Sequence, residues 1–177
     1  EVDGTTHAPG TLLAFDYDDY RAGGRESTVL FTPDAHTSLV DYAYTRSHLI
    51  IVTLHDVHTR VEVRELGSWA VVDFPGLPDL DTDPDESDEV FWMATSFTDP
   101  PSLLHSDGTT PRVIKRSPAY FDSESVTAEQ HFATSEDGTR IPYFVIRRRD
   151  VTTGPTLLYG YGGFENALTP SYLSLCG

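Results

Sequence analysis

Residues 156–164 read TLLYGYGGF, a short apolar stretch that runs directly into a glycine-rich turn. The apolar residues 156–158 predict a β-strand, and the glycines after it let the backbone approach a ligand or another segment closely. The turn is not a dinucleotide fingerprint, because G-x-G-x-x-G needs glycine where Glu165 stands, and no P-loop lysine follows. Two interpretations remain open: the turn approaches a ligand, or it is purely structural and places Tyr159 and Tyr161 in the core.

The chain before this turn consists of short β-type segments separated by turn residues, with almost no helical periodicity. The segments are rich in Val, Ile, Leu, Tyr or Thr, and Gly, Pro, Asp and Ser gather between them. We expect strands at residues 12–15, 28–31, 38–44, 49–54, 60–65, 68–72, 90–97, 102–105, 112–115, 129–133 and 141–147. Strands at this spacing predict an all-β sandwich, barrel or propeller.

A polar connector at residues 117–125 marks the expected domain boundary. The two strands expected after it flank residues 135–139, which read SEDGT. Asp-Gly tolerates positive φ, so this sequence is typical of a β-hairpin turn.

Residues 79–89 form a dense acidic stretch, which we expect to be a solvated loop. Asp79, Asp81 and Asp83 match the first three ligand positions of an EF-hand calcium loop. The sixth position must be glycine and is Pro84, and the twelfth must be a bidentate glutamate and is Val90. We therefore predict no structural metal.

The charge balance argues against nucleic acid and membrane surfaces as partners. The 28 acids outnumber the 12 bases, which gives a net charge of -16 that repels phosphate and anionic lipid. No run of apolar residues is long enough for a membrane helix. The single cysteine, Cys176, excludes an internal disulfide and favours a reducing cytoplasm, with a periplasmic location as the alternative.

The seven histidines are expected in ordinary turn and surface positions. His55 and His58 are not expected to bind a metal, because their spacing in a strand and turn directs the rings apart and no third ligand is apparent. The basic run at residues 147–149 ends a strand and is expected to be solvated.

Three motifs, in order, carry a resemblance to a known family. Residues 158–164 (LYGYGGF), continued by 168–172 (LTPSY), closely resemble the start of the hydrolase domain in the prolyl oligopeptidase family. Residues 137–142 (DGTRIP) resemble its hairpin, and residues 96–101 (SFTDPP) resemble a segment of its propeller. Together these motifs are far more specific than any one of them.

This resemblance implies a mainly β chain. Residues 1–120 are expected to be the last two or three blades of a β-propeller, and residues 121–177 the beginning of a truncated α/β-hydrolase domain. The family's Ser-Asp-His triad lies later in the chain, and this sequence contains no G-x-S-x-G nucleophile elbow. We therefore expect an inactive fragment. Because the parallel strands and helices that would cover its hydrolase part are absent, we expect residues 128–177 to be poorly ordered or prone to aggregation.

For the parent protein, the resemblance implies a serine-type endopeptidase that hydrolyses short peptides after proline, with the propeller as a size filter. Tyr161 is implied as a hydrogen-bond donor to the oxyanion, and Phe164 as a wall of the pocket for the substrate proline. No metal or organic cofactor is expected, and the parent is expected to be a monomer. The alternative from another class is a non-catalytic β-propeller module that binds a peptide or protein partner.

Overall fold

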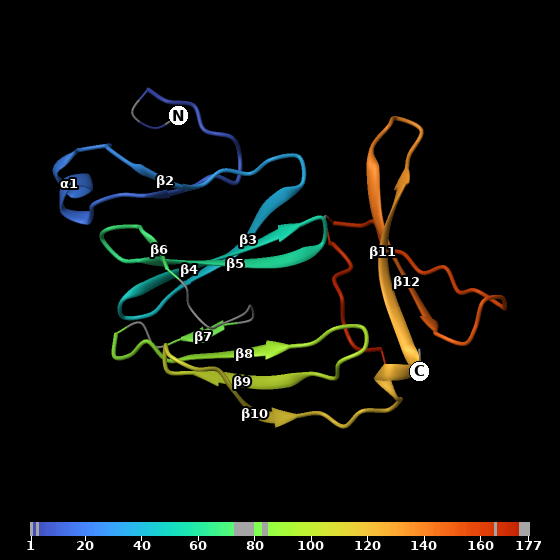
Figure 1. Ribbon diagram of the computed structural model, residues 1–177. Helices are drawn as coiled ribbons and strands as arrows, with labels where there is room; N and C mark the ends of the chain where they lie inside the picture. The colour runs from blue at the N-terminus through green and yellow to red at the C-terminus, as the bar shows by residue number, and fades with distance from the viewer. Residues whose placement is uncertain (1, 3, 73–79, 83–84, 165, 174–177) are drawn as a thin grey trace. The chain divides into compact units, whose positions relative to one another are not determined.

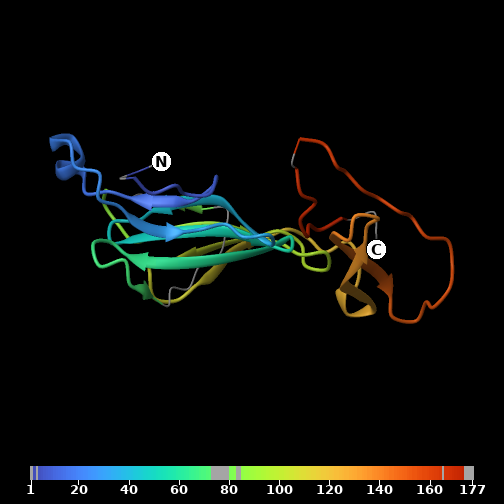
Figure 2. The same ribbon diagram turned by 90° about the horizontal axis from the view of Figure 1, so that it is seen from above.

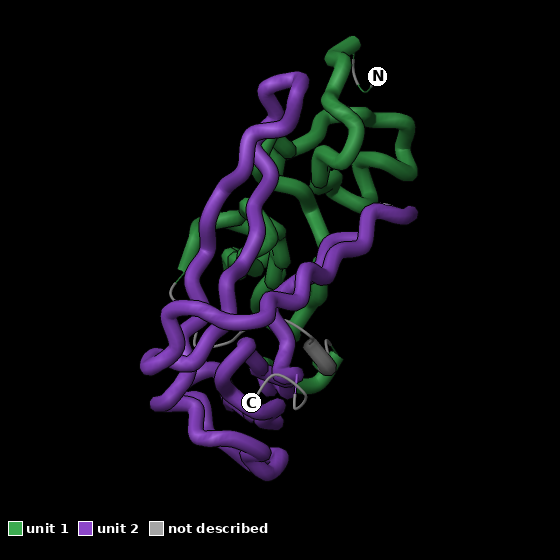
Figure 3. Tube along the Cα trace, turned by 90° about the vertical axis from the view of Figure 1, so that its right-hand side faces the viewer, with its two compact units in different colours: residues 1–74, 82–88 green, residues 75–81, 89–177 purple. Residues whose placement is uncertain are grey.

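The computed structural model describes residues 2, 4–72, 80–82, 85–164 and 166–173, and its regular elements are mostly β-strands (Figure 1). The chain divides into two compact units (Figure 3). The first comprises Glu1–Phe74 with Thr82–Asp88, and the second comprises Pro75–Asp81 with Glu89–Gly177. This division falls inside the part expected to be propeller, so the predicted domain boundary near residue 120 stays a prediction.

A two-stranded and a four-stranded antiparallel sheet build the first unit. Strands β1 (Leu12–Ala14) and β2 (Thr28–Phe31) pair with each other, and the short helix α1 (Tyr17–Ala22) connects them. The larger sheet contains β3 (Thr37–Tyr44), β4 (His48–His55), β5 (His58–Glu65) and β6 (Val71–Val72). Its strand order follows the sequence, so it is a four-stranded meander, the pattern of a propeller blade.

The core of the first unit lies on β4. Residues 49–52 are all buried, and because successive side chains point to opposite faces, both faces of this strand are covered. Leu49 and Ile51 form a buried cluster with Leu30 of β2. Partly buried hydrophobic residues complete the cluster: Leu12, Ala14, Leu39, Leu66 and Trp69.

A second four-stranded meander follows along the chain. It contains β7 (Leu80–Thr82), β8 (Val90–Ala94), β9 (Ser102–Ser106) and β10 (Arg112–Arg116), again paired in sequence order. The starts of β3 and β7 are roughly 40 residues apart, which is the repeat of a propeller blade.

A separate antiparallel ladder ends the regular part of the second unit. The 3₁₀ turn η1 (Ser123–Ser125) leads into β11 (Val126–Thr134), which pairs along its whole length with β12 (Arg140–Arg148). Gly138 has φ of 87° in the connecting turn, so the predicted Asp-Gly hairpin is confirmed. Residues 151–164 and 166–173 contain no strand or helix (Figure 2).

The structure corrects several expectations. The strand predicted at residues 156–158 is wrong: these residues are exposed, and no described strand pairs with them. β6 is shorter than residues 68–72, and β7 lies within the acidic stretch expected to be a loop. Most other strands appear within one to three residues of their expected ends.

Helix α1 was not expected, because its six residues are too few for a periodic pattern. Its ends carry ordinary signals: the Asp16 side chain accepts from the Asp19 backbone N–H, and Gly23 adopts φ of 102°. Among the described residues, no helix has the length and apolar character needed to cross a bilayer.

Candidate functional site

The two site residues implied by the sequence, Tyr161 and Phe164, lie on the irregular segment after β12. Tyr161 is 51% exposed and Phe164 is 98% exposed. Tyr159 is also exposed, so the alternative of a structural turn with two core tyrosines is wrong for this structure. The segment therefore presents its aromatic rings to solvent.

The backbone of Phe164 adopts an unusual conformation. Its φ is 55°, in the left-handed region that non-glycine residues seldom adopt. The Asn166 N–H donates to the Gly163 carbonyl oxygen at 3.1 Å and closes the turn around it. An exposed phenyl ring on a strained turn is unfavourable in isolation, and such strain is concentrated at ligand-binding positions.

The Tyr161 ring lies against Gly163. A Cβ atom added to Gly163 would be 3.0 Å from the Tyr161 hydroxyl oxygen and 3.2 Å from Cζ. At Gly160 and Gly162, an added Cβ would meet nothing within 4 Å. The absence of a side chain at Gly163 is thus what allows the phenol to occupy this place.

Tyr172, in the LTPSY part of the resemblance, connects the end of this segment to the connector before η1. Its hydroxyl oxygen accepts a hydrogen bond from the Tyr120 backbone N–H at 2.8 Å. Its ring stacks on Phe121, with centroids 4.9 Å apart and planes 13° apart. Sequence reasoning gave Tyr172 no role beyond the motif.

The SFTDPP motif forms a tight turn after β8. The Ser96 hydroxyl donates to the Asp99 carboxylate at 2.8 Å and accepts from the Asp99 N–H at 2.9 Å. Phe97 packs on Phe144 of β12, with ring centroids 4.9 Å apart. The motif therefore directs one aromatic ring onto the hairpin that precedes the Tyr161 segment.

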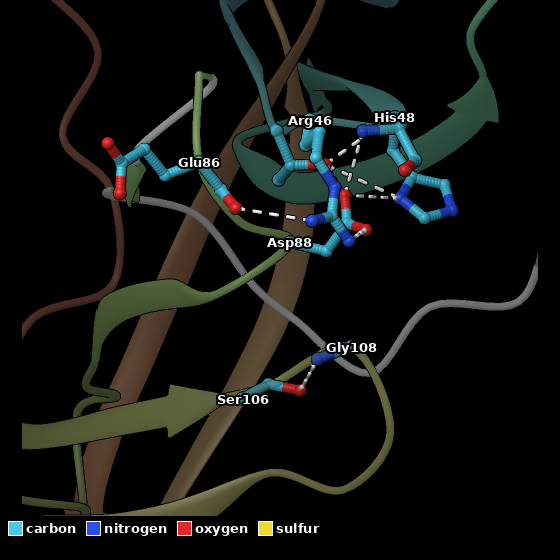
Figure 4. Close-up of polar contacts among 8 residues, drawn as sticks. Arg46, His48, Glu86, Asp88, Ser106 and Gly108 are labelled. Atoms are coloured by element: carbon cyan, nitrogen blue, oxygen red, sulfur yellow. Dashed lines mark hydrogen bonds and ion pairs between the residues drawn. The ribbon is translucent and has the colours of Figure 1, made fainter.

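A polar cluster missed by the sequence analysis surrounds Asp88 in the first unit (Figure 4). The Asp88 carboxylate accepts from the Thr45 hydroxyl at 2.6 Å and from the Ser47 N–H at 2.8 Å, and lies 3.3 Å from His48 Nδ1. Its side chain is 18% exposed. Partial burial raises the pKa of Asp88, but these hydrogen bonds outweigh it and lower the pKa to about 2.

The Asp88 cluster fixes the turn between β3 and β4. The Arg46 N–H and guanidinium donate to the Ser87 and Glu86 carbonyl oxygens at 2.9 and 3.3 Å, so the chain before Asp88 is also held (Figure 4). The expectation that residues 79–89 are only a solvated loop is therefore wrong at Asp88. A carboxylate that accepts backbone and hydroxyl hydrogen bonds acts as a local structural anchor.

His105 on β9 is buried, which corrects the expectation that all histidines occupy turn and surface positions. Arg112 Nε donates to His105 Nδ1 at 3.2 Å, so Nε2 carries the ring proton and faces Glu89 Oε1 at 3.3 Å. The buried hydroxyl of Ser106 accepts from the Gly108 N–H at 3.1 Å (Figure 4). These contacts satisfy polar groups inside the sheet and resemble no catalytic arrangement.

No group of three or more His, Cys, Asp or Glu within the described ranges could hold a metal ion. His55 and His58 are register partners at the end of the β4–β5 hairpin, and His55 Nδ1 lies 2.8 Å from the Thr37 hydroxyl oxygen. Asp79, Asp83 and Pro84 of the calcium-loop comparison lie outside the described residues. The basic run 147–149 is exposed as expected.

Comparison of the sequence with known proteins gives three informative relatives. Over 98% of its length, the chain is 36% identical to the uncharacterized peptidase y4nA of Sinorhizobium fredii, of which it covers 26%. It is 27% identical over 92% of its length to the uncharacterized peptidase RP174 of Rickettsia prowazekii, of which it covers 24%. Over 48% of its length it is 32% identical to the prolyl endopeptidase of Elizabethkingia meningoseptica, of which it covers 13%. No family model matches the chain.

The fold of the chain is also similar to solved structures of enzymes of this kind. A prolyl endopeptidase structure superimposes with a TM-score of 0.73 at 28% identity over 84% of this chain and 23% of its own. A post-proline cleaving enzyme of Rickettsia typhi reaches a TM-score of 0.79 at 24% identity over 97% of this chain and 27% of its own. The chain spans about a quarter of the length of the two uncharacterized peptidases and of the two solved structures. In sequence and in its propeller-type sheets, the chain resembles proteins of the prolyl oligopeptidase family over most of its length.

Proposed function

We propose that the chain is part of a serine-type endopeptidase that hydrolyses short peptides after proline. The observation that carries this proposal is the turn that presents Tyr161 and Phe164 to solvent, in a chain related over nearly its full length to a peptidase. Prolyl endopeptidases and a post-proline cleaving enzyme are among its relatives. The nucleophile, base and acid are assigned to residues outside these 177.

The assigned role of Tyr161 is to donate its phenol O–H to the oxyanion that forms when the scissile carbonyl is attacked. Charge on that oxygen develops in the transition state, so a donor aimed at it accelerates the chemical step more than it strengthens substrate binding. Loss of one such donor costs roughly 3 to 4 kcal/mol of transition-state stabilisation. Tyr161 is 51% exposed and its ring lies against Gly163, so a ligand could reach it from solvent.

The assigned role of Phe164 is to line the pocket for the substrate proline. A pyrrolidine ring has no N–H to satisfy, so a flat apolar surface suits it. The turn around Phe164 leaves nearly the whole phenyl ring available for such a contact. Burial of this ring by substrate would also recover part of the free energy lost by exposing it to water.

The proposal divides the chain into the last blades of a propeller, residues 1–120, and the beginning of an α/β-hydrolase domain, residues 121–177. The two four-stranded meanders support the first part. The change to the β11–β12 ladder and the irregular segment after it supports the second. A monomeric, cofactor-free enzyme in the cytoplasm, acting on short proline-containing peptides, completes the proposal.

The test compares this chain with the full-length gene product in hydrolysis of a chromogenic Gly-Pro substrate. We expect the 177-residue chain to be silent and the full-length product to be active. Tyr161→Phe in that product should lower kcat roughly 10²-fold or more without changing its unfolding, because only the O–H is lost. Tyr17→Phe removes an exposed phenol from α1 and serves as the matched control.

Two results would contradict the proposal. Turnover by the short chain alone would require a nucleophile within these residues. An inactive full-length product that binds proline peptides with a Kd unaffected by Tyr161→Phe would instead favour the non-catalytic binding module.

A further inference from the structure

We propose that Tyr172 is a positioning residue that holds the segment bearing Tyr161 and Phe164 in its working place. The inference rests on the proposed function of those two residues. The inference concerns the contact of Tyr172 with the residues just before η1. The proposed peptidase function does not require this contact.

Both ends of the segment attach to one short stretch of chain. At its beginning, the Arg149 N–H donates to the Ser125 carbonyl oxygen at 2.8 Å, and Arg149 Nε donates to the Glu124 carbonyl oxygen at 2.7 Å. At its end, Tyr172 accepts from the Tyr120 N–H at 2.8 Å and stacks on Phe121. Residues 120–125 therefore close a loop that runs from Arg149 to Tyr172.

This closure matters because the loop has few other restraints. Among the described residues from 151 to 173, Gly163, Pro170 and Tyr172 are half-buried and the rest are exposed. A loop tied at one end samples far more positions than a loop tied at both ends. Without the Tyr172 contact, the described attachments of the segment to β12 and η1 would lie at its start, at Arg149 and Val151, ten or more residues before Tyr161.

The residues just before Tyr172 have a restricted backbone conformation. Pro170, two residues earlier, has a fixed φ and restricts the conformation of Thr169 before it. The Tyr172 side chain makes two separable contacts, a ring stack and a hydroxyl that accepts a hydrogen bond. Substitution by phenylalanine removes only the second contact, and substitution by leucine removes both.

The experiment is a double-mutant cycle in the full-length gene product with the Gly-Pro substrate. We expect Tyr172→Leu to lower kcat roughly tenfold to a hundredfold, because a displacement of about 1 Å can have an effect of that size. Tyr172→Phe should recover most of the loss. If Tyr172 acts through Tyr161, the Tyr161→Phe/Tyr172→Leu variant should be no slower than Tyr161→Phe alone.

Tyr120→Leu is the matched control, since it removes an exposed ring beside the contact and keeps the backbone N–H that Tyr172 uses. It should leave kcat within about twofold, as expected for an exposed side chain outside the contact. In the 177-residue chain, Tyr172→Phe should speed hydrogen exchange of the Tyr120 amide, because its acceptor is lost.

The outcomes separate the inference from the proposed function. If Tyr161→Phe lowers kcat but Tyr172→Leu does not, the positioning role is wrong and the proposed function stands. If the two losses in kcat multiply in the double variant, Tyr172 does not act through Tyr161 and the inference is also wrong. If Tyr161→Phe has no effect while the Tyr120 amide still responds to Tyr172→Phe, the proposed role of Tyr161 fails, and with it the inference.

Discussion

Strands β4 and β12 have similar lengths and similar apolar content, yet they differ in strand pairing and in burial. β4 is paired on both sides, and residues 49–52 are buried on both of its faces. Among the described strands, β12 pairs only with β11, and none of its residues is buried. Pairing therefore needs only a compatible neighbouring strand, whereas burial needs further layers against the faces of the ladder.

The pattern along β12 indicates which face is more protected. Pro142, Phe144 and Ile146 alternate with the more exposed Ile141, Tyr143 and Val145. Phe97 packs on Phe144, so the half-buried face is the one that receives a contact from the SFTDPP turn. Truncation of a buried side chain in β4 should therefore lower the free energy of unfolding more than truncation of an exposed side chain in β12.

The largest expected effect comes from matched isoleucine substitutions in the two strands. Ile51 is 1% exposed and Ile141 is 48% exposed. Ile51→Ala should lower the free energy of unfolding by about 2 to 5 kcal/mol, because it removes buried methyl groups and leaves a cavity. Ile141→Ala should change it by less than about 1 kcal/mol.

Urea unfolding followed by tryptophan fluorescence and far-UV circular dichroism measures both variants. Trp69 packs against the cluster that contains Ile51, so it reports directly on the first unit. Equal losses in the two variants would break the comparison, because they would mean that the Ile141 face is covered in solution.

The next effect is the acid sensitivity of the Asp88 anchor. Its pKa is about 2 in the folded chain and near 3.8 when unfolded, so the carboxylate stabilises the fold at pH above about 5. As the pH falls toward 2, the unfolded state takes up the proton first and this stabilisation is lost. After allowance for solvent screening, we expect roughly 1 to 2 kcal/mol from this group.

Asp88→Asn separates this contribution from the other carboxylates. The variant should be less stable than the parent chain at pH 7, and the difference should shrink as the pH falls from 5 to 2. Urea midpoints measured at several pH values give the comparison. A difference that stays constant with pH would show that Asp88 acts through shape and not through its charge.

The sequence was sufficient where the signal is local. The strand boundaries of β2 to β5 and the Asp-Gly hairpin follow from apolar segments divided by turn residues, whereas the choice of a propeller among the all-β folds followed from the family resemblance. The family resemblance also emerged from three short motifs in order, and the relatives confirm it. These features depend on neighbours in the sequence and need no knowledge of distant contacts.

Sequence reasoning failed where a residue's role depends on distant partners. Asp88 reaches Thr45 and Ser47 across more than 40 residues of chain, and an acidic stretch gives no sign of that. The apolar residues 156–158 predicted a strand, but strand formation requires a pairing partner that the described chain does not supply. The burial of His105 could have been suspected, since this residue belongs to a predicted strand and follows two leucines.

Gly163→Ala should have the smallest effect on the free energy of unfolding, but a specific effect on the position of the Tyr161 ring. The added Cβ would meet the Tyr161 hydroxyl oxygen at 3.0 Å and displace the phenol, while the exposed segment contributes little to unfolding. Gly162→Ala adds the same methyl group where nothing lies within 4 Å. We expect both variants to keep the urea midpoint of the parent chain, and Gly163→Ala to lose more kcat in the full-length product. Equal kcat losses would show that backbone freedom, and not the place of the Tyr161 ring, is what the glycines provide.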